Sequence, residues 1–412
     1  MMEEIINIIT NWIGNNEKIF SMGDAILFLI FLVSVLYLFV FALFSIKKKT
    51  YTYPTARKKY RFAILFPAYK EDFVILHSVE DFLENEYPRD LYDIIVISDQ
   101  MSDETNKKLL DLSAKVVEIT NSPSNKTNAL KKAVEYIDNG DMKYDIVVIL
   151  DADNLTDNDF LEKINDAFYS GCSAVQTHRV AKNRDTNIAV LDAVSEEINN
   201  SIFRKGHTQI GFSSALIGSG MAFEYELFKE CIMSSKHIGV DKQLEQILLL
   251  QNIYIEYLEV VYTYDEKVAN KDSFYDQRRR WLSNQFHNLF YGLKNIPLAI
   301  LRGNWDYCNK LFQWMMPPRI VLFGLIIIIA AIMTIIDWPL SIKWWGLFLL
   351  LCIAFSLAVP DYLVDKRFKK ALASLPLVFT LMCLNFFRLK GANKEFIHTQ
   401  HSNTSTSSNT SV

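Results

Sequence analysis

Two aspartates in the middle of the chain, Asp151 and Asp153, directly follow an uncharged apolar run at residues 146–150. The run is mostly β-branched, which is typical of a strand buried on both faces of a parallel sheet. Because side chains two residues apart share one face of an extended strand, both carboxylates are expected at the carboxyl end of this strand. Paired carboxylates there would suit a divalent cation that holds phosphate oxygens. An ordinary turn of Asp and Asn after a core strand is the alternative interpretation.

Two further polar clusters follow predicted strands at residues 62–66 and 93–98. In an open α/β sheet the carboxyl ends of the strands meet at one rim, where ligands bind. The convergence of three clusters favours a binding site over three unrelated turns. Taken singly, Asp99 could be a simple turn residue and Lys126 the solvated start of a helix predicted at 126–137. The candidate residues that these segments add are Ala68, Tyr69, Glu71, Asp99 and Lys126.

Two later segments could contribute to the same site. Residues 218–223, which include Gly218, Ser219, Gly220 and Met221, suit a flexible loop where backbone approaches a ligand closely, although by themselves they are more typical of an ordinary turn. Asp241 opens a helix predicted at residues 240–250. An acid at this place either complements the helix dipole or acts as a catalytic base, and the sequence does not separate the two.

Three consecutive arginines precede Trp281. One interpretation is a surface helix that meets anionic lipid headgroups, with its aromatic residue at the interface. In the other, Gln277 and Arg280 face a diphosphate while the indole of Trp281 stacks on a sugar ring. This second interpretation is chemically reasonable because a planar apolar face fits the CH side of a pyranose.

The composition indicates a membrane protein with a soluble insert. Half of the 412 residues are apolar, and long uncharged runs lie on both sides of a mixed, charged middle. In that middle, strand and helix patterns alternate from residue 62 to about 266, which predicts a doubly wound, nucleotide-binding α/β layer. The net charge of −4 gives no support for nucleic-acid binding. Five cysteines without metal or disulfide spacing favour a reducing compartment.

The first apolar run predicts a transmembrane helix. Residues 25–46 are uncharged and, at about 1.5 Å per residue, long enough to cross a bilayer core of about 30 Å. Lys47, Lys48 and Lys49 follow, so the positive-inside rule places residues 1–24 outside and the next domain in the cytoplasm. The run is too long for a signal peptide, and lysines stand where a cleavage site needs small residues.

The second half of the chain returns to the membrane. Residues 284–318 mix aromatic and charged residues, which predicts interfacial helices, and 320–336 and 344–360 predict an out-and-back pair of spans. Residues 371–387 have basic flanks on both sides, which favours a re-entrant or interfacial element over a fourth span. Residues 391–412 form a predicted cytoplasmic tail whose polar end is expected to be disordered.

In their order along the chain, these motifs resemble those of the membrane-bound, processive family-2 glycosyltransferases, the group of cellulose, chitin and hyaluronan synthases. The resemblance covers residues 61–281 and, more loosely, the membrane segments around them. It implies a nucleotide-binding mixed-sheet domain of GT-A type at residues 51–281, inserted between transmembrane and interfacial helices. The residues that carry it are Pro67, Ala68, Tyr69, Asp99, Asp151, Asp153, Gly218 to Met221, Asp241, Gln277, Arg280 and Trp281.

The resemblance also implies a role for each residue. Asp151 and Asp153 would hold Mg²⁺ or Mn²⁺, and Asp241 would be the general base toward the acceptor hydroxyl. The residues implied to bind the UDP-sugar donor are Ala68, Tyr69, Glu71, Asp99, Lys126, Asp151, Gln277 and Arg280. The residues implied to contact the acceptor are Gly218, Ser219, Gly220, Met221 and Trp281.

The leading hypothesis is an inverting glycosyltransferase that builds a polysaccharide from a UDP-sugar on the cytoplasmic face of the plasma (inner) membrane. The alternative is transfer of one sugar to a membrane lipid. Three predicted spans are few for a wide tunnel, so either a homo-oligomer or single transfer would resolve that difficulty. A non-catalytic membrane scaffold is a third hypothesis, and the intact acids at Asp151, Asp153 and Asp241 argue against it.

Overall fold

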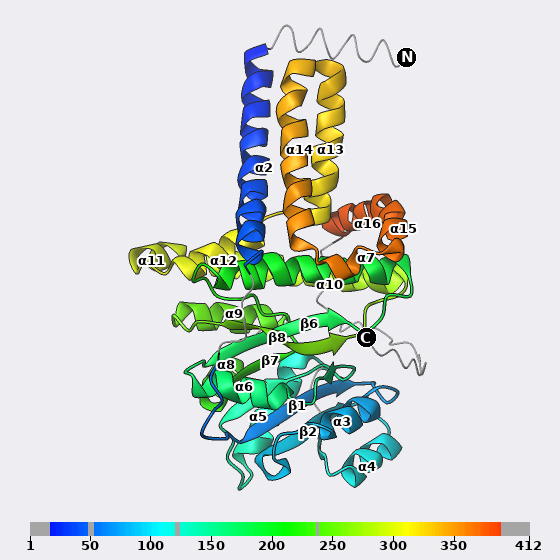
Figure 1. The fold of residues 1–412 in the computed structure, drawn as a ribbon. Helices are drawn as coiled ribbons and strands as arrows, with labels where there is room; N and C mark the ends of the chain where they lie inside the picture. Colours follow the sequence, from blue (N-terminus) through cyan, green and yellow to red (C-terminus); the bar gives the residue numbers. More distant parts are fainter. Residues whose placement is uncertain (1–16, 48–52, 120–123, 236–238, 389–412) are drawn as a thin grey trace.

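The structure is a computed structural model of the chain, and it describes residues 17–47, 53–119, 124–235 and 239–388. A lower α/β domain carries a group of long helices above it (Figure 1). Some predicted features lie outside the described residues: the N-terminal segment up to residue 16, Lys48 and Lys49, and the tail at 391–412.

One mixed sheet forms the centre of the lower domain. Its eight strands in the described residues follow the order β3-β2-β1-β4-β7-β6-β8-β5. Strands β3, β2, β1 and β4 pair in parallel, β7 is antiparallel to β4 and β6, β8 is parallel to β6, and β5 is antiparallel to β8. The strands are β1 (Phe62–Tyr69), β2 (Tyr92–Asp99), β3 (Lys115–Ile119), β4 (Ile146–Ile149), β5 (Leu155–Thr156), β6 (Ala174–Ala181), β7 (Met221–Glu224) and β8 (Glu256–Asp265). The predicted α/β class with a mixed sheet is confirmed.

Side chains of the central strands alternate between two apolar layers. Along β1, Phe62, Ile64 and Phe66 pack with α3 and α6, whereas Ala63 and Leu65 pack with α5, α8 and α9. Burial on both faces explains why such a strand appears in the sequence as an unbroken apolar run. The helices of the domain are α3 (Ile75–Leu83), α4 (Asp103–Asp111), α5 (Lys126–Asp138), α6 (Phe160–Tyr169), α7 (Asn187–Asn199), α8 (Tyr225–Ser234) and α9 (Val240–Leu250).

The predicted loop at residues 218–223 is a loop only in its first part. Gly218 and Gly220 have left-handed φ values of +90° and +61°, but the chain then enters β7 at Met221. Met221 is fully buried and pairs with Ile149 of β4 and Gln176 of β6. The loop prediction is wrong for residues 221–223, because their backbone pairs with β4 on one side and β6 on the other, and their side chains are buried in the core.

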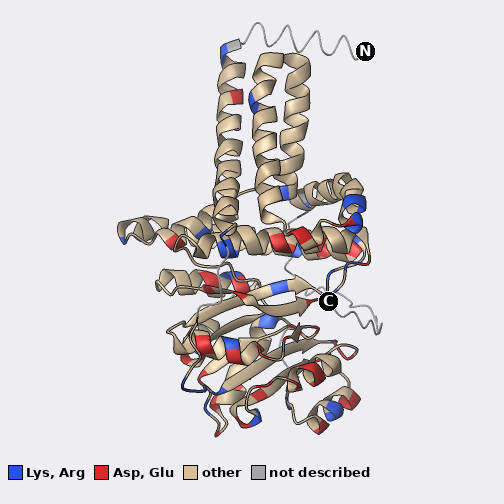
Figure 2. Ribbon diagram, in the orientation of Figure 1, with Lys and Arg blue, Asp and Glu red and all other residues tan. Residues whose placement is uncertain are grey.

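Long helices stand side by side above the sheet domain, and other helices, α7 among them, lie across their base (Figure 1). The upright helices are α2 (Glu17–Ser45), α13 (Arg319–Ile336) and α14 (Trp338–Ala358), and those across the base include α10 (Lys271–Leu293), α11 (Ile296–Leu301) and α12 (Trp305–Met315). Figure 2 shows few charged residues on the upright helices and many on the sheet domain. Two of those few, Asp24 and Lys343, form an ion pair, and Trp344 Nε1 donates to Asp24 at 2.9 Å.

A fourth apolar segment lies low beside the base of α13 and α14 (Figure 1). It comprises α15 (Lys366–Ala371) and α16 (Leu375–Phe387), and α16 packs against α10 and α13 through Val378 and Met382. By length and composition, the described residues contain four helices able to cross a membrane, the fourth being Lys366–Phe386. The choice between a re-entrant segment and a fourth span stays a prediction.

Candidate active site

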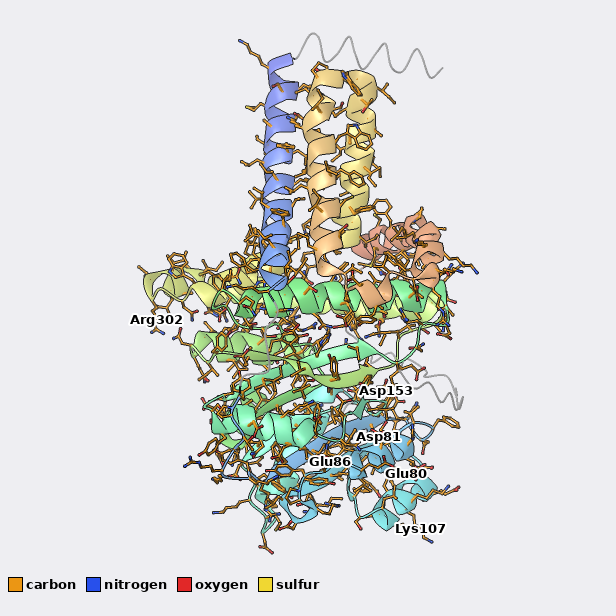
Figure 3. All side chains as sticks on the ribbon, in the orientation of Figure 1. Glu80, Asp81, Glu86, Lys107, Asp153 and Arg302 are labelled. Carbon is orange, nitrogen blue, oxygen red and sulfur yellow. The ribbon has the colours of Figure 1, made fainter. Side chains whose placement is uncertain are left out.

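A cavity of about 1070 Å³ lies between the carboxyl ends of the sheet strands, the start of α9, one face of α10 and the lower turns of α13 and α14. In Figure 3, Asp153 lies on the side of the sheet domain that faces the helices across the base. The predicted site residues that line the cavity are Ala68, Tyr69, Glu71, Asp99, Lys126, Asp151, Asp153, Gly218, Asp241, Gln277, Arg280 and Trp281. Residues that are far apart in the sequence therefore meet in one site.

The ends of β1 and β2 form one corner of the cavity, where Tyr69 and Asp99 are register partners. The Lys70 N–H donates to the Asp99 carbonyl at 3.1 Å, and both Lys70 and Gln100 turn with positive φ, at 56° and 57°. The Ser124 hydroxyl donates to the Asp99 carboxylate at 3.0 Å. Burial raises the pKa of Asp99, while the Ser124 hydrogen bond and the Lys70 charge oppose that rise. This corner can accept hydrogen bonds from donors on a ligand.

Helix α5 brings a cation to the carboxylates. Asn125 caps the helix by accepting from the Asn128 N–H at 2.8 Å, which places Lys126 in the first turn. The Lys126 ammonium forms an ion pair with Asp151 and donates to the Gly218 carbonyl at 2.7 Å. This lysine therefore joins three separate segments at the cavity, and it is placed to exchange its partners for phosphate oxygens.

Asp153 is held in one orientation by its neighbours. It is only 3% exposed; its Oδ2 accepts from the Glu266 N–H at 2.9 Å, and its Oδ1 accepts from Asn154 Nδ2 at 3.3 Å. Asp151 and Asp153 offer the hard oxygen atoms that Mg²⁺ and Mn²⁺ prefer. No group of three or more His, Cys, Asp or Glu side chains able to hold a metal exists among the described residues. If the two aspartates hold a cation, its remaining ligands would have to come from water or a bound diphosphate.

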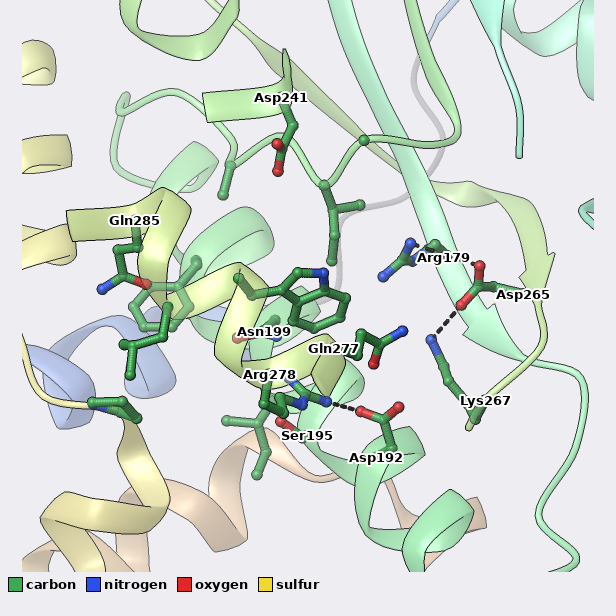
Figure 4. Close-up of a pocket in the computed structure, with 18 of the residues that line it drawn as sticks. Arg179, Asp192, Ser195, Asn199, Asp241, Asp265, Lys267, Gln277, Arg278 and Gln285 are labelled. Atoms are coloured by element: carbon green, nitrogen blue, oxygen red, sulfur yellow. Dashed lines mark hydrogen bonds and ion pairs between the residues drawn. The ribbon is translucent and has the colours of Figure 1, made fainter. Parts of the chain in front are cut away.

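A buried charge cluster that the sequence analysis missed lies next to these carboxylates. Lys267 pairs with Asp265 at 2.8 Å (Figure 4). Glu196 pairs with Arg179 at 3.0 Å and with Arg204 at 3.1 Å. Four of the five line the cavity, Glu196 being the exception. The sequence does contain an indication of this cluster. Charged residues lie at the end of the strand Glu256–Asp265, just as they lie at the ends of the predicted strands.

The acids of this cluster predict a pH dependence of stability. Burial alone would raise the pKa of Asp265, but the charges of Arg179 and Lys267 lower it to about 2 from an ordinary value of 3.8. Because the folded-state pKa is lowered, the stabilisation is complete above about pH 4 and is lost as the pH falls toward about 2. The thermal unfolding midpoint in detergent should fall across this window, and Asp265→Asn should flatten that fall. The same slope in the variant would contradict this assignment.

Helix α10 presents one face to the cavity, because residues three and four apart lie on the same side of a helix. Gln277, Arg280 and Trp281 lie on this face, and Gln277 Oε1 is buried without a hydrogen-bond partner. Burial lowers the pKa of Arg280, while the charges of Asp151, Asp241 and Asp276 oppose that fall. A guanidinium on the wall of the same cavity can hold the charge of a departing diphosphate.

Asp241 lies in the first turn of α9, and its neighbours fix the position of this helix. Gly239 has a φ of +95°, and an added Cβ would lie 3.1 Å from Asn284 Cγ, so the start of α9 packs tightly on α10. One turn later, the fully buried Glu245 pairs with Lys310 of α12 at 2.8 Å. Figure 4 shows the Asp241 carboxylate pointing into the cavity.

Ser219, Gly220 and Met221 lie behind the cavity wall. The Ser219 side chain is fully buried and its hydroxyl donates to Asn154. A Cβ on Gly220 would lie 2.2 Å from Thr177 Oγ1, so this position requires glycine for packing. Of the four residues implied to contact an acceptor in this loop, Gly218 lines the cavity and the other three support it from the core.

Comparisons with known proteins agree with this architecture. Residues 60–284 match the family described as "Glycosyltransferase like family 2", and no curated protein matches the sequence. Among solved structures, the mannosyltransferase PcManGT from Pyrobaculum calidifontis, in complex with GDP-Man and Mn²⁺, aligns with a TM-score of 0.53 and 16% identity. That alignment covers 89% of this chain and 99% of the mannosyltransferase.

Two other solved structures align with lower TM-scores and cover a smaller share of this chain. Glucosyl-3-phosphoglycerate synthase from Mycobacterium tuberculosis aligns with a TM-score of 0.40 and 18% identity over 56% of this chain and 79% of its own. Residues 1–349 of S. aureus TarS align with a TM-score of 0.39 and 13% identity over 77% of this chain and 92% of that one. Because the family match spans more than half of the sequence, this chain belongs to the glycosyltransferase-like family 2 and is a glycosyltransferase.

Proposed function

We propose that this enzyme transfers a sugar from a UDP-sugar, with inversion, to a hydroxyl group of an acceptor held at the membrane surface. One observation carries the proposal: a single cavity joins the carboxylates at the sheet rim to the apolar lower turns of α13 and α14. A site with both parts suits a charged, soluble donor and an amphiphilic acceptor. The orientation proposed from the lysines after α2 places the sheet domain in the cytoplasm and α2, α13 and α14 in the plasma (inner) membrane.

The donor would occupy the rim of the sheet. Ala68, Tyr69, Glu71 and Asp99 line the corner that is proposed to hold the uracil and ribose. The diphosphate would then lie against Lys126, Gln277 and Arg280, with Asp151 and Asp153 as ligands of Mn²⁺ or Mg²⁺. A bound cation would neutralise diphosphate charge there. The complex of PcManGT with GDP-Man and Mn²⁺ supports the choice of a nucleotide sugar and a cation, while the uracil base rests on the resemblance.

The acceptor would enter from the side of Asp241, Gly218 and Trp281. Its hydroxyl oxygen attacks the anomeric carbon while the bond from that carbon to the diphosphate oxygen breaks, which inverts the configuration. Asp241 takes the hydroxyl proton as general base, and UDP leaves toward Arg280. Trp281 offers a flat apolar face to a sugar ring.

The extent of the cavity favours single transfer to a lipid over polymerisation. Its lining reaches the turns of α13 and α14 nearest the sheet domain, such as Phe323 and Phe355, while Asp24 and Asp337 at the far end of the bundle are not part of it. Polysaccharide synthesis remains the second candidate, supported by Trp281 and Trp314 on the cavity wall, which resemble the stacking surfaces of a glycan site.

One assay separates these functions. The purified full-length chain in nanodiscs is incubated with a panel of radiolabelled UDP-sugars, Mn²⁺ and a membrane lipid extract, and the products are sized. We expect label in a lipid that carries one added sugar. Labelled products that form a ladder of sizes or one long glycan would establish polysaccharide synthesis instead. If no UDP-sugar is consumed, both proposed functions are contradicted.

A further inference from the structure

The half of the cavity farthest from the sheet has an apolar wall. It is formed by the lower turns of α13 and α14 and by α16, and it includes Leu322, Phe323, Phe355, Val359, Val378 and Met382. The proposed sugar nucleotide has no group that gains from such a wall, whereas a hydrocarbon chain does. The residues where this wall meets the polar part of the cavity therefore face the head of any lipid that enters.

Arg319, the first residue of α13, stands at that boundary. Its Nη2 donates to the carbonyl and hydroxyl oxygens of Ser195 at 3.0 and 3.1 Å, and its guanidinium lies 5.6 Å from the ring centroid of Phe203. Its Nη1 is buried and has no hydrogen-bond partner. The contacts that Arg319 does make are with neutral groups, so its charge has no direct counter-ion among the residues that the structure describes.

The nearby acids are already engaged by other cations. Asp192 forms an ion pair with Arg278, as Figure 4 shows. Glu196 pairs with Arg179 and Arg204, and Lys267 lies 3.6 Å from it. Neither carboxylate forms an ion pair with Arg319.

Arg278 supplies a second guanidinium on the same wall. It lies over the rings of Phe274 and Trp281, at 5.0 and 4.4 Å from their centroids, and its Nε is buried without a partner. Its partner Asp192 and the Arg319 partner Ser195 are three residues apart on α7 and therefore share one face of that helix, and both arginines line the cavity. Two arginines so placed are suited to bind an anion that offers several oxygen atoms.

We propose that Arg319 and Arg278 bind the phosphate group of a lipid whose chain lies along the apolar wall and whose headgroup extends past the phosphate, so that its hydroxyl reaches toward Asp241. Burying a cation without a counter-ion is costly, and a ligand that supplies the counter-charge offsets that cost. The inference rests on the proposed function and deepens it, because it assigns the acceptor to the class of phosphate-bearing lipids.

The test measures lipid binding without a sugar donor. Full-length protein in phosphatidylcholine nanodiscs is titrated with farnesyl phosphate and with farnesol, and binding is followed by native mass spectrometry. We expect at least about tenfold tighter binding of the phosphate, loss of that preference in Arg319→Met, and partial retention in Arg319→Lys. Arg302→Met, which removes an exposed arginine of the same helical layer, is the matched control and should bind like the wild type. Equal affinity for phosphate and alcohol, or an unchanged preference in Arg319→Met, would overturn the proposal.

Thermal unfolding distinguishes a ligand-binding arginine from a structural one. Without added lipid, Arg319→Met should unfold at the wild-type temperature or above it, because an uncompensated buried charge has been removed. Farnesyl phosphate should raise the unfolding temperature of the wild type but not that of the variant. A variant that unfolds well below the wild type in the absence of ligand, while Arg302→Met does not, would overturn the binding role.

Two further arms separate the inference from the function on which it rests. Inorganic phosphate that competes as strongly as farnesyl phosphate would show a site for free phosphate and not for a lipid, and the assignment to the acceptor would fall. UDP-sugar consumption is measured in parallel: sugar transfer to phosphate-free lipids alone would leave the proposed function standing and remove the inference. Specific binding of farnesyl phosphate without any UDP-sugar consumption would remove the proposed function instead.

Discussion

Asp241→Asn is expected to reduce sugar transfer by about 10²- to 10⁴-fold, the usual contribution of a positioned general base. The amide has almost the shape of the carboxylate but cannot take the acceptor proton. UDP binding should be retained, because the corner at Asp99 and the carboxylates at Asp151 and Asp153 are unchanged. The measurement compares initial rates of transfer with the affinity for UDP in the same preparation.

The alternative role of Asp241, complementing the dipole of α9, has a matched control in Asp272. Both acids lie in the first turn of a helix, but Asp272 belongs to α10, is exposed, and does not line the cavity. Loss of such a dipole interaction costs about 0.3–1 kcal/mol of stability. Asp272→Asn should therefore show that small loss with normal transfer. If Asp241→Asn behaves in the same way, the base must be sought elsewhere.

Much of the site could be predicted from the strand ends. A buried parallel strand needs an unbroken apolar run, so its end is visible in the sequence, and topology brings such ends to one rim. That logic correctly grouped Tyr69, Asp99 and Asp151 in one cavity. It did not find Asp265 and Lys267, since the strand before them alternates apolar and polar residues and was not recognised as part of the same sheet.

Other features depend on packing that no local pattern reveals. The short strand at Met221 is defined by its partners on both sides, Ile149 and Gln176, and the glycines before it suggested a loop. Arg319 directly precedes the span predicted at residues 320–336, and nothing in the sequence marks it as a site residue. Its unpartnered Nη1 became visible only after Ser195 and Phe203, more than a hundred residues earlier, were placed beside it.

Asp153→Asn should remove the metal dependence of transfer and lower its rate by at least about 10²-fold. A bound cation contributes several kcal/mol of charge stabilisation, and each 1.36 kcal/mol corresponds to tenfold in rate. Asparagine keeps an oxygen for the Glu266 N–H but loses the negative charge that a cation requires. Binding of Mn²⁺ in the presence of UDP, followed by electron paramagnetic resonance, should be lost in the variant. Transfer should no longer rise with Mn²⁺ concentration.

The control is Asp157→Asn, an isosteric change a few residues further along the chain. Asp157 accepts from the Tyr264 hydroxyl at 3.0 Å and does not line the cavity, so its replacement should leave Mn²⁺ binding and transfer intact. In the Asp153→Asn variant the new amide would also face the Asn154 amide, a contact between two donors that costs about 1–3 kcal/mol. The unfolding midpoint of both variants is therefore measured first. A folded Asp153→Asn variant that still binds Mn²⁺ as tightly as the wild type would mean that this carboxylate is not the metal ligand, and Asp151 would then have to carry the cation alone.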